Sequence, residues 1–143
     1  MLKATVTTIA LMAAVTFFGH NAHADAFSKL EHVFTKLEPV YNPLPILIPA
    51  GKSPQQVSGA IRRSLLAKEW QILNAEKGRV EARYNSPKLW RATVDIRYDS
   101  ESIRMTYKDS DGLKYNSDSG VIHKMYAVAV RDLEKIIQGQ IRN

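Results

Sequence analysis

The sequence contains no cysteine and only four histidines among its 143 residues. Without thiols the chain cannot form disulfides, and it lacks the cysteine to which a lipoprotein attaches its lipid. Structural zinc sites are also disfavoured, because their usual ligands are cysteine and histidine. The sequence has no nucleophile elbow, no phosphate-binding glycine loop and no helical pair of histidines. We therefore expect no metal, no cofactor and no enzymatic activity.

The composition is that of one globular domain. Hydrophobic residues make up 45% of the chain, charged residues make up 24%, and the formal net charge is +6. These proportions exclude disordered and collagen-like classes, and the absence of cysteine excludes a disulfide-stapled one.

The amino terminus has the pattern of a secretory signal peptide. Lys3 precedes an apolar stretch, Ala4–Phe18, and the segment ends in small residues around Ala22–Ala24. The stretch is too short, and too rich in alanine and threonine, for a confident membrane span. We predict a signal peptide over residues 1–24, cleaved between Ala24 and Asp25, with an uncleaved anchor as the alternative. Cleavage would leave 119 residues with a net charge of +5, periplasmic or secreted and without an integral membrane span.

Residues 25–50 are predicted to form an N-terminal helix and a proline-rich strap. Apolar residues at spacings of three and four predict a short amphipathic helix over Asp25–Glu38, ended by Pro39. The following stretch, Val40–Gly51, contains three prolines, which exclude a helix or a central strand. Its apolar residues favour an extended connector or edge strand that packs on the rest of the domain.

Residues 51–143 contain two predicted helices. The first extends over Pro54–Lys68, where Ser53 is a good N-cap and Gln56 is placed for a capping box. The second extends over Ile122–Gln138, and Gly139 is its expected stop.

Between these helices the hydrophobic period changes from 3.6 to 2. Four runs of alternating apolar and polar residues predict strands near 70–74, 79–84, 90–98 and 103–108. The short connections between them make neighbouring strands antiparallel. We predict an α+β fold: a two-layer sandwich in which a four-stranded antiparallel meander carries both long helices on one face, in the order helix–β–β–β–β–helix. The two tryptophans are interpreted as core residues.

One motif resembles a known family. It consists of a tyrosine-rich run followed by the start of the second helix: Tyr107-x-Asp109-Ser110-x-x-Leu113-x-Tyr115, then Ile122-His123-x-x-Tyr126. The pattern is similar to that of small secreted or lipid-anchored bacterial envelope proteins without an assigned function, over about residues 50–137. The resemblance implies a fold and a compartment, and no catalytic residues. Two features depart from it: the anchoring cysteine is missing, and Ala127–Val130 stands where many relatives carry a tryptophan.

The loop after the last strand is the first candidate site. His123 could act beside Asp109, Ser110 and Tyr126 as a pH-sensitive ligand contact or general base. Alternatively, these residues cap turns and pack the loop on the domain. A calcium loop is not predicted, because the glycine is at the fourth place rather than the sixth and no acid stands at the twelfth.

The solvent face of the sheet is the second candidate. Pairing from the short loops would place Arg91 opposite Arg83 and Arg97 opposite Arg104. Like charges directly opposite one another destabilise a sheet, so such pairs call for neighbouring acids or an anionic partner. The alternative is an ordinary solvated face of mixed charge.

These features predict a non-enzymatic binding or interaction module of the bacterial cell envelope. The expected partner is an envelope protein or an anionic envelope polymer or lipid, and not nucleic acid, which an exported protein would not meet. One alternative is a small hydrolase or transferase centred on His123 with Asp109 or Asp118. The other is an inhibitor or immunity-type protein that caps a partner.

Overall fold

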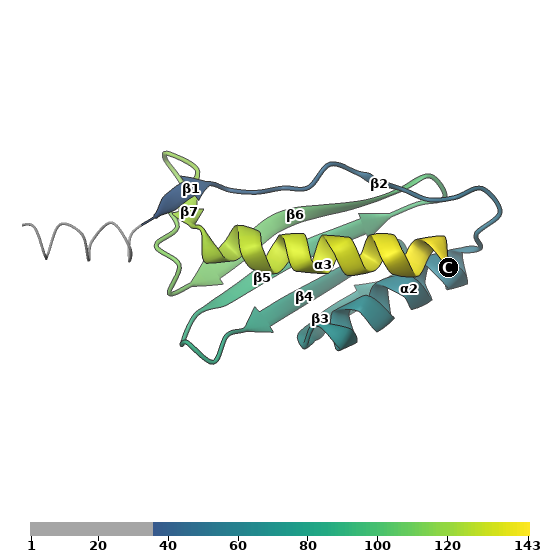
Figure 1. Ribbon diagram of the computed structural model, residues 1–143, viewed down its shortest axis with the longest axis horizontal. Helices are drawn as coiled ribbons and strands as arrows, with labels where there is room; N and C mark the ends of the chain where they lie inside the picture. The colour runs from purple at the N-terminus through teal and green to yellow at the C-terminus, as the bar shows by residue number, and fades with distance from the viewer. Residues whose placement is uncertain (1–35) are drawn as a thin grey trace, which may run out of the picture. The chain divides into compact units, whose positions relative to one another are not determined.

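A computed structural model describes residues 36–143 of the chain. The predicted signal peptide and most of the predicted first helix lie outside these residues. The described part is α+β, and its main sheet has five antiparallel strands in the spatial order β2-β6-β5-β4-β3 (Figure 1). The strands are β2 (Ile46–Leu47), β3 (Trp70–Glu76), β4 (Arg79–Asn85), β5 (Arg91–Tyr98) and β6 (Ser102–Asp111).

The predicted meander is confirmed as β3 to β6, but the sheet has five strands rather than four. The fifth, β2, comes from the strap: Ile46 pairs with Ile103 on β6, and Leu47 pairs with Ser102. Each proline removes only its own backbone donor, so the residues between two prolines can still pair at an edge. The expectation that the strap could form an edge strand is therefore correct, and the strand count based on the meander alone is wrong.

The first predicted helix forms as α2 (Pro54–Ala67) with the expected capping box. The Gln56 backbone N–H donates to Ser53 Oγ at 3.2 Å, and the Ser53 N–H donates to Gln56 Oε1 at 2.8 Å. The box satisfies two backbone donors that the first turn of a helix leaves free.

The last helix, α3 (Met125–Arg142), starts and ends later than predicted. It continues through Gly139, so the expected stop is wrong. A glycine lowers helix stability only modestly, and the last turn gains the burial of Ile141, which is 2% exposed.

A second, two-stranded sheet explains the late start of α3. Its strands are β1 (Leu37–Pro39) and β7 (Val121–His123), and Leu37 lies opposite His123. Leu37 and Glu38 were expected at the end of the first helix, and this part of the prediction is wrong. Pro39 disfavours helical backbone at the residue before it, while β7 offers strand hydrogen bonds. The order of elements between β6 and α3 therefore includes a strand that the periodicity did not indicate.

The strap is held along its length, as expected for a docked segment. The Tyr41 hydroxyl donates to Glu134 Oε2 at 2.7 Å, and the Arg131 guanidinium lies 4.5 Å from the centre of the Tyr41 ring. Further along, the Tyr107 backbone N–H donates to Asn42 Oδ1 at 2.9 Å. The strap is thus fastened to both α3 and β6.

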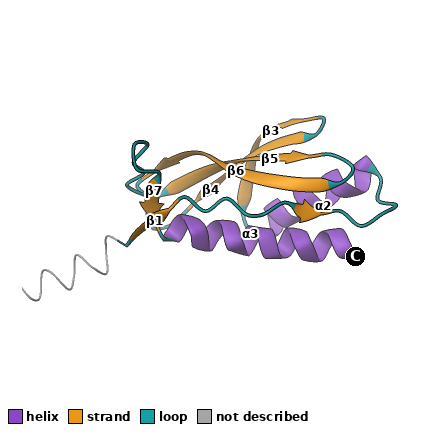
Figure 2. Ribbon diagram, turned by 90° about the horizontal axis from the view of Figure 1, so that it is seen from above, coloured by secondary structure: helices purple, strands orange, loops and turns teal. Residues whose placement is uncertain are grey.

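One apolar core lies between the sheet and the two helices. It combines buried residues of α2 and α3 with the alternate residues of the strands that face them. Figure 2 shows α3 lying along one side of the sheet. The opposite side, here called the outer face, carries the polar strand positions and has no helix over it within residues 36–143. The helix-covered side is called the inner face.

Candidate functional site

The outer face carries almost balanced charge. Strand register, together with the ion pair between Lys108 and Glu81, places six basic and five acidic residues on it, which leaves a net charge of only +1. They are Arg79, Arg83, Arg91, Arg97, Arg104 and Lys108, and Glu76, Glu81, Asp95, Asp109 and Asp111. The four arginines named from the sequence all lie on this face, but their charge is mostly matched by neighbouring acids.

Positive charge is concentrated at one end of the face. Arg79 on β4 lies opposite Arg97 on β5, and Arg97 lies opposite Arg104 on β6. We call these three residues the arginine row. Glu76 on β3 extends the same row, and the next row inward carries Glu81 and Asp95. The pairing of Arg97 with Arg104 is confirmed, whereas Arg79 was not among the sequence candidates.

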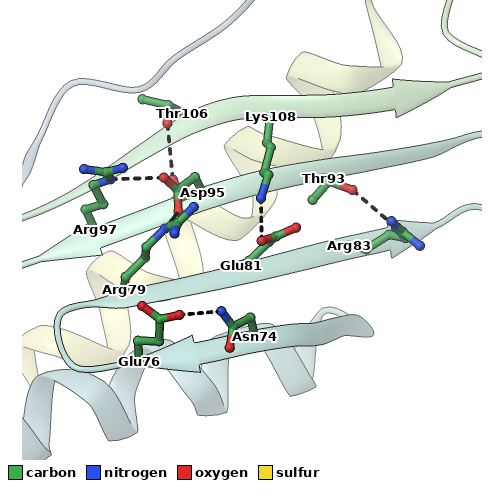
Figure 3. A network of polar contacts seen from close by, with 10 residues as sticks. All are labelled: Asn74, Glu76, Arg79, Glu81, Arg83, Thr93, Asp95, Arg97, Thr106 and Lys108. Atoms are coloured by element: carbon green, nitrogen blue, oxygen red, sulfur yellow. Dashed lines mark hydrogen bonds and ion pairs between the residues drawn. The ribbon is translucent and has the colours of Figure 1, made fainter.

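Asp95 holds two of the three arginines (Figure 3). Arg79 Nε lies 2.7 Å from Oδ1 of this carboxylate and Arg97 Nε lies 3.0 Å from Oδ2. The Asp95 side chain is only 11% exposed. Burial raises the pKa of this carboxyl, but the hydrogen bonds from Arg79 and Arg97 outweigh burial and hold the pKa below its ordinary value. Asp95 is therefore ionised at neutral pH and orients both guanidinium groups through their Nε atoms.

The outward parts of the arginine row stay available. Within residues 36–143, the Nη atoms of Arg79 and Arg97 donate no hydrogen bond, and Arg104 makes no side-chain hydrogen bond or ion pair. The Arg97 side chain is 69% exposed. Guanidinium groups with free terminal nitrogens bind the oxygens of phosphates and carboxylates in pairs. The row can thus offer several donors to one anionic partner.

The other two candidate arginines are placed differently from the prediction. Arg91 lies opposite Asn85 rather than Arg83, and its guanidinium is 3.3 Å from Asp111. Arg83 lies opposite Thr93 and donates to its hydroxyl at 3.3 Å. The predicted pairing is wrong because the register is shifted by two residues: Tyr84 lies opposite Ala92 rather than Trp90. The β4–β5 loop extends over residues 86–90, closed by a hydrogen bond from the Ser86 N–H to the Trp90 carbonyl at 2.8 Å.

The structure does not assemble the loop residues into a polar site. His123 lies on β7, where Nδ1 accepts a hydrogen bond from the Met125 backbone N–H at 3.3 Å. No carboxylate of the described chain lies within 4.0 Å of its ring nitrogens. Asp109 lies on the outer face, while Ser110 points to the other side and bonds the Tyr107 hydroxyl at 2.9 Å. His123 Nδ1 therefore bonds the first backbone N–H of α3, and no carboxylate among residues 36–143 is placed to form a catalytic pair with the ring.

Tyr126 is a core residue. Its side chain is fully buried and packs edge-on against Tyr107, with ring centres 5.4 Å apart. Tyr107 in turn contacts Tyr115 at 4.5 Å. The Tyr126 hydroxyl has no hydrogen-bond partner among the described residues, and burial raises its pKa. Tyr126 thus stabilises the loop against α3 and does not reach a surface ligand.

In the part of the chain that the structure describes, no three histidine, aspartate or glutamate residues converge as metal ligands. Neither α2 nor α3 combines the length and the apolarity required to cross a membrane.

Comparisons with known proteins give no family. No protein-family model matches the sequence, and no curated protein matches it. The resemblance to small envelope proteins therefore stays a prediction, and function has to be inferred from geometry and chemistry.

Proposed function

We propose that the protein is a non-enzymatic binding module of the bacterial cell envelope that contacts a phosphate-bearing polymer or lipid through the arginine row. The expected export of the chain supports the compartment. The observation that carries the proposal is the in-register placement of Arg79, Arg97 and Arg104 on three adjacent strands around the single carboxylate of Asp95.

The energetics of this row favour an anionic partner. Like charges directly opposite one another on neighbouring strands repel, and the single negative charge of Asp95 balances only one of the three arginine charges. An anion bound across the row would relieve this repulsion. Because Asp95 fixes two guanidinium groups by Nε, their Nη atoms are oriented before binding, which lowers the entropy lost on complex formation.

A pair of matched double variants tests this proposal. R97Q/R104Q removes two charges from the arginine row and leaves Asp95 paired with Arg79. R83Q/R91Q removes two charges from the same face outside the row, so both variants lose the same net charge. Binding is measured to soluble polyphosphate and to phosphatidylcholine vesicles with and without phosphatidylglycerol.

We expect R97Q/R104Q to bind about tenfold more weakly at low salt, and R83Q/R91Q to bind within about twofold of wild type. About 0.5 M salt should weaken the wild-type interaction strongly, since exposed charges are screened. A preference for vesicles identifies a lipid, and a preference for polyphosphate identifies a polymer. Equal losses in the two double variants, or binding that resists salt, would refute a role specific to the row.

A further inference from the structure

A cleft of about 270 Å³ opens on the helix-covered side, away from the arginine row. It lies where α2 ends at Ala67, beside the first half of α3 and above the end of the sheet that carries Trp70 and Tyr84. Figure 1 shows the reason: α2 and α3 lie close near the carboxyl terminus, where Arg63 bonds Gln140 at 3.0 Å, and diverge toward the start of α3.

Three aromatic residues whose rings follow one another line this cleft, and we call them the aromatic wall. Trp70 on β3 lies 5.6 Å from Tyr84 on β4, and Tyr84 lies 5.2 Å from Trp90 in the β4–β5 loop. Each ring is tilted by 43° or 46° from its neighbour, so the wall is not the flat platform on which a sugar ring stacks. Trp70 and Trp90 are only 3% and 9% exposed, so the rings are held firmly by packing.

The rim of the cleft carries free carboxylates. Lys68, Glu69 and Asp132 contribute one positive and two negative charges, in a chain whose net charge is +6. Within the described residues, the side chains of Glu69 and Asp132 make no ion pair and no hydrogen bond. This contrasts with the outer face, where Asp95 and Glu81 contact basic side chains at 2.6 to 3.0 Å.

Glu69 occupies a backbone position that favours glycine. It follows the C-cap residue Lys68 of α2 with a φ of +58°, in the left-handed region. Glycine or asparagine is the usual residue at this place after a helix, because a larger side chain is strained there. Glu69 lines the cleft from this strained position, where glycine would be more stable.

We infer that this cleft binds a small organic cation, a substituted ammonium ion, with its charge against the aromatic wall and between Glu69 and Asp132. Aromatic ring faces attract cations through their quadrupole, and the attraction grows when the site is partly shielded from water. The two free carboxylates add complementary charge, and Val128 on α3, which is 45% exposed, offers apolar contact to alkyl groups.

Titration with a matched pair of probes tests this inference. Choline carries the cationic head, and 3,3-dimethylbutan-1-ol is its neutral counterpart of the same shape. The protein's two tryptophans both line the cleft, so tryptophan fluorescence reports on this site, and calorimetry provides a second readout. We expect saturable binding of choline and at least about tenfold weaker binding of the neutral probe. Equal binding of both probes, or no saturable binding of choline by either method, would overturn the inference.

Variants separate the cleft from the rest of the molecule. Glu69→Gln and Asp132→Asn should each weaken choline binding by about fivefold or more, since each removes one charge next to the cation. Asp118→Asn is the matched control: it removes the same charge from an exposed carboxylate in the loop before β7 and should leave binding unchanged. If Asp118→Asn weakens choline binding as much, the effect comes from net charge alone, and the inference that choline binds in the cleft is contradicted.

Glu69→Gly tests whether the strained glutamate serves binding. Glycine relieves the left-handed backbone, so the variant should melt at a higher temperature while binding choline more weakly. If the melting temperature and the affinity for choline both fall, Glu69 only supports the fold. R97Q/R104Q should bind choline as wild type does, so a failure of the arginine row and a failure of the cleft are distinguishable.

Discussion

The two faces of the sheet use their carboxylates in opposite ways. On the outer face Asp95, Glu81 and Asp111 each contact a basic side chain, at distances from 2.6 to 3.3 Å. At the cleft above the inner face, Glu69 and Asp132 contact no basic side chain of the described chain. Paired carboxylates orient neighbours and support the fold, whereas unpaired ones remain available to a ligand.

The difference also indicates which charges are free for binding. On the outer face Asp95, Glu81 and Asp111 contact basic side chains and Glu76 accepts a hydrogen bond from Asn74, whereas Asp109 makes no side-chain contact within residues 36–143. The donors left for an anion are the Nη atoms of Arg79 and Arg97 and the whole of Arg104. At the cleft what remains is negative. A protein with a modest net charge can therefore present two sites of opposite preference on the two sides of one sheet.

The largest expected effect is that of Gly112→Ala, which would displace the loop that contributes Trp90 to the cleft. Gly112 has a φ of +72°, and an added Cβ would lie 2.9 Å from the Leu89 carbonyl oxygen and 3.1 Å from Trp90 Cβ. We expect a loss of about 2–3 kcal/mol in the free energy of unfolding, measured by urea denaturation, together with weaker choline binding.

Gly139→Ala is the matched control for this change. Among the described residues, no atom outside the neighbouring helix backbone lies within 4 Å of a Cβ added at this helical glycine, so alanine should stabilise the protein by about 0.5–1 kcal/mol. A Gly112→Ala protein as stable as wild type would show that the close approach of Gly112 to the β4–β5 loop is not required.

Asp95→Asn comes next, because it removes the one acid that the arginine row shares. Arg79 and Arg97 would remain opposite each other without a charged partner, and we expect the free energy of unfolding to fall by about 1–3 kcal/mol at pH 7.

The pH dependence of stability gives an independent check on Asp95. Its pKa is lowered in the folded state, so its stabilisation is present above the unfolded pKa of about 4 and is lost as pH falls through the folded value. Wild type should therefore lose stability below about pH 4 more steeply than Asp95→Asn. Part of the acid sensitivity should persist in the variant, because backbone hydrogen bonds from Glu101 and Ser102 lower the pKa of Asp99 as well. Parallel acid profiles would contradict the role given to Asp95.

Local patterns in the sequence predicted the elements that depend on local physics. The capping box of α2 and the alternation of β3 to β6 were both recognisable, since each is set by neighbouring residues. The fifth strand and β7 were not, because two or three residues become a strand only when a distant partner supplies their hydrogen bonds.

The candidate sites were predictable only in part for the same reason. The pairing of Arg97 with Arg104 could be predicted from the short turn between β5 and β6. The pairing of Arg79 with Arg97 could not, because it depends on the register that the β4–β5 loop sets. Trp70 and Trp90 were correctly interpreted as buried. That they also line a cleft depends on the divergence of α2 from α3, which no periodicity encodes.

Asp132→Asn gives the smallest expected change in stability and the sharpest contrast between the faces. Because this carboxylate makes no contact with a basic group of the described chain, its removal should change the free energy of unfolding by less than about 0.5 kcal/mol. Choline binding should nevertheless weaken. Asp95→Asn makes the same chemical change on the outer face and should lower stability while leaving choline binding intact. Urea denaturation and calorimetry on both variants measure this crossed pattern. If Asp132→Asn costs as much stability as Asp95→Asn, the cleft carboxylate supports the fold, and the distinction between paired and available acids fails.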